Sequence, residues 1–201
     1  MEIQIILIVV LAVLLAISVI RLATSRHSST NDAINNIMTR TSVRNFSSTP
    51  VSENQIDTLL RAAMAAPSAV NRQPWKFIVI KNHGLMCQIA DSIANARPLV
   101  GAACAIVVCG DMTKALDGVE RGFWIDDCSA ATENILLAAN ALGLGTVWLG
   151  IHPIAEREAI VRSIAQLPES LAPLCVVAIG YPDGQTTPKN KWNAQNYKIL
   201  D

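Results

Sequence analysis

Two short polar segments near opposite ends of the chain carry the side-chain types that bind phosphate groups. Their phosphate-binding candidates are Arg40, Thr41, Ser42, Arg44, Lys189 and Lys191. Arginine binds phosphate oxygens through a planar fork of N–H groups, and hydroxyl groups add short hydrogen bonds. In an extended segment, Arg40, Ser42 and Arg44 would emerge on one side. The alternative is that Arg40 is a helix C-terminal cation and Arg44 a solvated surface residue.

A second candidate is the segment 66–75, with the sequence Ala-Pro-Ser-Ala-Val-Asn-Arg-Gln-Pro-Trp. Pro67 and Pro74 restrict its backbone, which would hold the amides of Asn71 and Gln73 in place. Each amide can both donate and accept hydrogen bonds, as the edge of a heterocyclic ring requires. The alternative is a helix-ending turn in which Asn and Pro only shape the backbone.

A third candidate segment is bracketed by Gly145 and Gly150. Glycine lets a backbone approach a flat ring closely, and backbone N–H groups there can polarise ring atoms. The fragment is not a dinucleotide fingerprint, because no Gly-x-Gly-x-x-Gly sequence follows a strand. His152 lies just beyond the segment, where a loop residue is a better interpretation than a proton source.

Composition and charge exclude several function classes. Lys+Arg and Asp+Glu both total 16, so no net field draws the protein towards nucleic acid. The five cysteines are odd in number and lie mostly in apolar runs, which is typical of buried thiols in a reducing compartment. No His and Cys residues have zinc-ligand spacing. We interpret Asp126 and Asp127 as a negative first helical turn, and Glu133 as a helix-surface residue.

The N-terminus contains a long apolar run. Residues 5–23 are almost entirely Ile, Leu, Val and Ala and would form about 28 Å of helix, close to the hydrocarbon thickness of a bilayer. We predict a single-span membrane anchor at 1–24 and a tether at 25–31. Arg21 and Arg26 follow the apolar stretch 5–20 and no basic residue precedes it, which predicts a cytoplasmic main domain. A cleaved signal peptide is the alternative, although it would need a basic start.

Hydrophobic periodicity and turn signals predict a mixture of helices and short strands. Ser52 and Gln55 form a capping box before a helix, and Gly143 is the expected end of the longest helix. From Tyr181 onward the chain is polar, which predicts disorder unless a partner orders the segment. The expected strands are 75–80, 104–109, 146–149 and 174–179, and the expected helices are 31–40, 52–66, 82–93, 124–142 and one beginning at 153.

In residue type and order, these segments resemble the FMN-dependent nitroreductase family. The resemblance covers about residues 32–192 and rests on four pieces, which are 40–44, 66–75, 143–150 and 188–191. It implies an α+β domain at 32–201, with a mostly antiparallel sheet flanked by helices, in an intertwined homodimer. It also implies that an arm from about 181 crosses to the other subunit. Lys191 departs from the family pattern, in which arginine is common.

The resemblance further implies FMN as cofactor at the dimer interface and NAD(P)H as co-substrate. The cofactor-binding residues would be Arg40, Thr41, Ser42, Arg44, Pro67, Ser68, Asn71, Gln73, Trp148, Leu149, Gly150, Lys189 and Lys191. Phe123 and Trp124 would contact the substrate, with ordinary packing as the alternative. In this interpretation the flavin N5 carries a ping-pong hydride transfer to nitroaromatic, quinone or similar flat acceptors, and no protein residue is catalytic.

Two other functions are considered for the same fold. One is reductive dehalogenation of halotyrosine-like substrates, which is disfavoured because the lid region 111–124 contains no tyrosine. The other is a non-catalytic, membrane-tethered flavin-binding module, which would bind FMN without oxidising NAD(P)H.

Overall fold

The computed structural model describes residues 13–18 and 32–200. The chain divides into two compact units, Met1–Thr39 and Arg40–Asp201. In the first unit, residues 13–18 and 32–39 are helical. The helix at 32–39 confirms the short helix predicted to end near Arg40.

The predicted anchor and tether lie largely outside the described residues. Of the predicted span at 5–23, the structure describes only residues 13–18, and it describes none of the tether at 25–31. Within the described part of the chain, no helix has the length and apolar character needed to cross a membrane.

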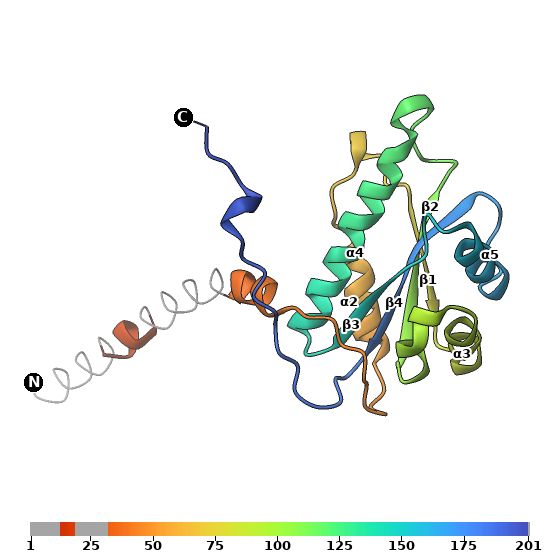
Figure 1. Ribbon diagram of the computed structural model, residues 1–201. Coiled ribbons are helices and arrows are strands. Elements are labelled where there is room, and N and C mark those ends of the chain that lie inside the picture. Colours follow the sequence, from red (N-terminus) through yellow and green to blue (C-terminus); the bar gives the residue numbers. More distant parts are fainter. Residues whose placement is uncertain (1–12, 19–31, 201) are drawn as a thin grey trace, which may run out of the picture. The chain divides into compact units, whose positions relative to one another are not determined.

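A four-stranded antiparallel sheet lies at the centre of the second unit (Figure 1). Its strands, in the spatial order β1-β2-β4-β3, are β1 (Trp75–Ile80), β2 (Cys104–Asp111), β4 (Leu171–Gly180) and β3 (Gly145–Gly150). All three neighbouring pairs are antiparallel, which confirms the sheet type implied by the resemblance. The inner strands β2 and β4 are buried on both faces, so their sequences are continuous apolar runs without polar alternation.

Helices cover both faces of this sheet (Figure 1). They are α2 (Glu53–Met64), α3 (His83–Ser92), α4 (Phe123–Ala141) and α5 (Ala155–Ile164). Successive strand residues point to opposite faces, so Ile106 and Val108 belong to the core under α2 and α4, whereas Val107 belongs to the core under α3 and α5. The sheet therefore separates two hydrophobic cores.

The predicted helix boundaries have the expected chemistry. Ser52 and Gln55 form the complete capping box of α2, and the Asn82 side chain accepts a hydrogen bond from the backbone N–H of Leu85 at the start of α3. Gly143 follows α4 with a φ of 72°, a left-handed conformation that glycine adopts without a steric penalty.

Two elements differ from the sequence prediction. Helix α5 begins at Ala155, not at Pro153, because the Ile154 N–H donates to the Ile151 carbonyl in a preceding turn. Strand β4 begins earlier than predicted and contains Pro173. This proline lies opposite Cys109 at a register shift, where the missing N–H is tolerated.

The C-terminal segment from Tyr181 has little regular structure and is mostly exposed. It contains one short 3-10 helix, η4 (Ala194–Asn196). The rings of Trp192 and Tyr197 contact each other, with centroids 5.6 Å apart, but both side chains are exposed. The segment therefore presents two large exposed aromatic rings on an otherwise polar stretch.

Candidate functional site

The segment 40–44 runs along the edge of β3 that is not paired with β4. Ser42 forms a parallel bridge with Thr146, and the Val43 N–H donates to the Thr146 carbonyl at 2.8 Å. A side chain at Gly145 would place its Cβ 2.7 Å from the Cβ of Val43. Gly145 therefore allows the close approach of this segment, and not the approach of a ring as its sequence position had suggested.

This arrangement gathers the predicted phosphate-binding side chains around one cavity. The cavity has a volume of about 160 Å³ and is lined by Arg40, Thr41, Ser42, Arg44, Lys189 and Lys191. Two adjoining cavities share residues with it and extend along the same edge, one of them reaching Gly143. Two segments almost 150 positions apart in the sequence thus meet at one site.

The charge of the cavity is strongly positive. Four cationic side chains line it, and the only carboxylate paired with one of them among the described residues is Glu133 of α4, which lies 3.4 Å from the Nε atom of Arg40. The Arg40 side chain is 15% exposed, so Glu133 holds a largely buried guanidinium in place. Glu133 is on the helix surface, as predicted, but it also orients a member of the candidate site.

The amide-rich loop before β1 has a tightly constrained backbone. Val70, Asn71 and Gln73 have positive φ values of 45°, 57° and 51°, a region that non-glycine residues rarely occupy. The Ser68 hydroxyl accepts a hydrogen bond from the Gln73 backbone N–H at 3.0 Å. Strained backbone held in this way is common at ligand-binding sites.

The side chains of this loop have complementary hydrogen-bonding groups. Gln73 Nε2 donates to Asn71 Oδ1 at 2.9 Å, and both side chains are exposed. The pairing uses the acceptor of Asn71 and one donor of Gln73. This pairing leaves the Asn71 amide N–H groups available as donors and the Gln73 side-chain oxygen available as an acceptor.

Asp127 anchors this loop, a role that the sequence interpretation did not predict. Its side chain is 6% exposed, and its Oδ1 atom accepts a hydrogen bond from the Ala69 N–H at 2.8 Å. Asp126 lies in the first turn of α4 as predicted, but Asp127 points inward. The signal was its helical phase, because Asp127 is four residues before the buried Ala131.

The loop and the basic cavity are far apart within one chain. Asp127 lies near the start of α4, whereas Gly143, which lines an adjoining cavity, follows its end. Sixteen residues of helix span about 24 Å. No residue of the segment 66–75 lines the basic cavity, so the predicted cofactor-binding residues form two groups in a single copy.

The predicted residues at the end of β3 differ in accessibility. Leu149 is buried in the core under α3 and α5, and Trp148 packs partly on the other core, so neither offers a freely exposed side chain. Gly150 is open, because an added Cβ would meet no atom within 4 Å. Any contact of this segment with a ligand would involve mainly backbone atoms.

The two aromatic residues predicted to contact substrate are also separated. Phe123 is 46% exposed at the start of α4, whereas Trp124 is 7% exposed. The Trp124 ring packs over Gly110, where an added Cβ would collide with it, and makes an edge contact with the His152 ring at a centroid distance of 5.0 Å. Of the pair, only Phe123 is accessible in a single copy.

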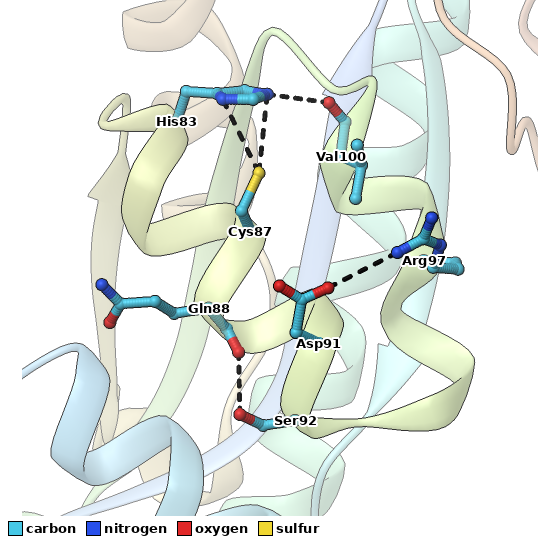
Figure 2. Close-up of polar contacts among 7 residues, drawn as sticks. All are labelled: His83, Cys87, Gln88, Asp91, Ser92, Arg97 and Val100. Carbon is cyan, nitrogen blue, oxygen red and sulfur yellow. Dashed lines mark hydrogen bonds and ion pairs between the residues drawn. The ribbon is translucent and has the colours of Figure 1, made fainter.

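The cysteines are free thiols, as predicted, and four of the five are buried. Burial raises the pKa of Cys104 to about 11 and that of Cys175 to about 12. Cys87 is partly exposed, and Figure 2 shows its sulfur beside the His83 ring, 3.6 Å from Nδ1. The described residues contain no group of three or more potential metal ligands.

Comparison with known proteins identifies the family. The nitroreductase family profile matches residues 37–111 and 95–181. A candidate NADH dehydrogenase/NAD(P)H nitroreductase of Archaeoglobus fulgidus is 44% identical over 146 residues, which are 73% of this chain and 83% of that protein.

Solved structures agree with this assignment. A protein of the same description from Parabacteroides distasonis matches with a TM-score of 0.80 and 41% identity, over 85% of this chain and 98% of the other. The NADPH:FMN oxidoreductase of Vibrio harveyi, solved with NAD+, matches with a TM-score of 0.74 and 26% identity, over 84% of this chain and 79% of the other. The chain therefore belongs to the nitroreductase family.

Proposed function

We propose that this protein is an FMN-dependent oxidoreductase that takes electrons from NAD(P)H and passes them to nitroaromatic, quinone or similar flat acceptors. The family assignment and the names of the relatives support an NAD(P)H-dependent oxidoreductase. The single observation that supports FMN as the cofactor is the cavity lined by Arg40, Thr41, Ser42 and Arg44 together with Lys189 and Lys191.

The donor chemistry of this cavity fits the phosphate of FMN. Two guanidinium groups, two ammonium groups and two hydroxyls converge on it, and Glu133 offsets one positive charge. The remaining excess suits a dianion, since a charge with no counterpart in a partly buried site is costly. Lys191, where the family usually has arginine, supplies a point charge in place of a planar fork.

The second group of residues suits the ring of the flavin. The exposed donor of Asn71 and acceptor of Gln73 match an imide edge, which presents both a carbonyl and an N–H group. Because this loop lies far from the basic cavity in one copy, we propose a homodimer in which the loop of one subunit faces the cavity of the other. The exposed arm from Tyr181 would pack on the same partner.

In this function the residues bind and orient, and the cofactor supplies the chemistry. FMN held by these residues would supply hydride-transfer chemistry between NAD(P)H and the acceptor. The basic cavity fixes the phosphate, and the open backbone at Gly150 leaves room for the ring. No side chain is assigned as a catalytic acid or base.

The decisive experiment compares FMN with riboflavin, which lacks the phosphate. Dissociation constants would be measured by flavin fluorescence quenching for the wild type and for the Lys189→Met/Lys191→Met variant. The wild type should prefer FMN, and the variant should lose most of that preference. The control is Lys76→Met/Lys114→Met, which removes the same charge from exposed positions. Equal affinity of the wild type for both flavins would refute the proposed phosphate site.

Activity then distinguishes the functions that share this fold. NADH and NADPH oxidation would be followed with a nitroarene, a quinone and a halotyrosine as acceptors. Turnover of the nitroarene or quinone supports the proposal. Faster turnover of the halotyrosine would favour reductive dehalogenation, and stoichiometric FMN without NAD(P)H oxidation would favour a flavin-binding module.

We also propose that residues 5–23 anchor the protein in a membrane, with the family domain on the cytoplasmic side. The support is the apolar sequence of residues 5–20 and the position of Arg21 and Arg26 after this stretch. The full-length protein should stay in the membrane fraction after a high-salt wash and dissolve in detergent. Release by salt alone would exclude an inserted helix.

A further inference from the structure

Arg157 contacts the end of β3 at which the flavin ring is proposed to lie. Its Nη1 atom donates a hydrogen bond of 3.0 Å to the carbonyl oxygen of Gly150. The side chain is half-buried and reaches this carbonyl from the first turn of α5. Arg157 takes part in none of the ion pairs of the described residues, so its positive charge is not neutralised there.

The contact lies on the free edge of β3, the same edge as the basic cavity. Alternate residues of a strand direct their backbone groups to the same side. Ile151 donates to Leu174 in β4, whereas Thr146 accepts from Val43 on the opposite side. Gly150, four residues after Thr146, therefore shares the edge of Thr146. The two are about 13 Å apart at 3.3 Å per residue.

The residue after Arg157 also contacts the turn that follows β3. Glu158, the next residue of α5, forms a hydrogen bond with the His152 ring, and its Oε1 atom lies 2.7 Å from His152 Nδ1. The His152 ring in turn packs against Trp124. The turn after β3 is thus held by two consecutive residues of α5. Two carboxylates flank Arg157 in sequence: Glu158 is paired with His152, and the exposed Glu156 forms no ion pair with Arg157 among the described residues.

We infer that Arg157 is a positioning residue for the flavin, and that its charge favours the reduced form of the cofactor. This inference rests on the proposed function. A hydride from NAD(P)H brings two electrons into the site, and NAD(P)+ leaves as the oxidised product. Reduction of bound FMN by this hydride would add one negative charge to the ring unless a proton followed. A permanently charged guanidinium at the ring end of the site stabilises that charge, while its hydrogen bond fixes the Gly150 peptide.

Replacing Arg157 by Gln tests the charge while keeping a hydrogen-bond donor. Dissociation constants for oxidised FMN and the midpoint potential of the bound flavin would be measured in the full-length protein. In Arg157→Gln, binding of reduced relative to oxidised FMN should fall about tenfold, since nearby charges commonly shift such equilibria by one power of ten or more. For a two-electron couple this lowers the potential by about 30 mV. Arg157→Lys should retain most of the wild-type potential.

The matched control is Arg162→Gln. Arg162 lies on the same helix and also donates to a backbone carbonyl, that of Pro168, so this variant removes an equal charge away from Gly150. Arg157→Met replaces the test variant if Arg157→Gln does not fold. A potential in Arg157→Gln that is equal to that of Arg162→Gln would refute the inference and leave the proposed function intact. A wild-type protein that binds no FMN would refute both.

Discussion

Gly145 links the sheet to the candidate phosphate site, so replacing it by alanine should weaken both stability and FMN binding. The new Cβ would lie 2.7 Å from the Val43 Cβ and 2.8 Å from both of its γ carbons. Ordinary contact begins near 3.4 Å, so the segment 40–44 must move away from β3 by about 0.7 Å. Directed along the Val43–Thr146 hydrogen bond, this shift would lengthen it from 2.8 Å to about 3.5 Å, where such bonds are weak.

The expected cost follows from these two effects. Overpacking in a buried region costs about 1–3 kcal/mol, and a weakened backbone hydrogen bond adds about 0.5–1.5 kcal/mol. A loss of roughly 2–4 kcal/mol should lower the melting temperature by about 5–15 °C in a domain of this size. If the displaced segment loses one charge-assisted hydrogen bond to phosphate, FMN affinity should fall at least about tenfold.

Thermal unfolding and flavin fluorescence quenching measure the two effects separately. Gly122→Ala is the control, because an added Cβ there meets no atom within 4 Å and the backbone φ is −59°. Val43→Ala should partly rescue Gly145→Ala, since it removes both γ carbons but leaves the Cβ contact. The reasoning is refuted if Gly145→Ala matches Gly122→Ala in melting temperature and in FMN affinity.

Three further predictions concern a buried carboxylate and the cysteine thiols. Asp127→Ala should cost about 1–3 kcal/mol of stability, because the Ala69 N–H loses its acceptor, and it should also weaken FMN binding. Urea unfolding should show a smaller loss of stability for Asp127→Asn and almost none for Asp126→Ala, because Asp126 is exposed. The native protein should react with a thiol reagent at Cys87 alone at pH 8, with five thiols reacting after denaturation, so rapid native reaction of a second thiol would contradict the buried positions. Burial raises the pKa of Cys109 to about 12 from its ordinary value of 9.0. A thiol with a raised pKa in the folded state stabilises the fold below pH 9 and loses that contribution as the pH rises towards 12. The urea midpoint should therefore fall between pH 9 and pH 12, and a flat profile would contradict the shift.

Much of the fold was predictable from local signals. The capping box at Ser52, the stop at Gly143 and the strand at 75–80 depend on neighbours within a few residues, and such interactions are visible in the sequence. The strand that begins at Leu171 was predicted only from residue 174, and the missed part contains Pro173, which cannot donate a ladder hydrogen bond. Only the register shift opposite Cys109 shows why it is tolerated there.

The candidate site was predictable in composition but not in arrangement. The residue types of 40–44 and 188–191 indicated phosphate chemistry, and the structure brings both segments to one cavity. The roles of Asp127, Glu133 and Arg157 depend on contacts between elements that are far apart in sequence, or on the direction of a backbone carbonyl. No local pattern encodes such contacts.

The sequence by itself determined the kinds of groups in this protein, because side-chain chemistry, helix periodicity and turn signals are properties of short segments. The tertiary structure decided which of those groups can act together. The antiparallel pairing of β3 with β4 leaves one edge of β3 free, and the absence of a side chain at Gly145 lets the basic segment lie along that edge. This packing, which no isolated segment contains, places four cations around one cavity while the amide loop stays near the other end of α4.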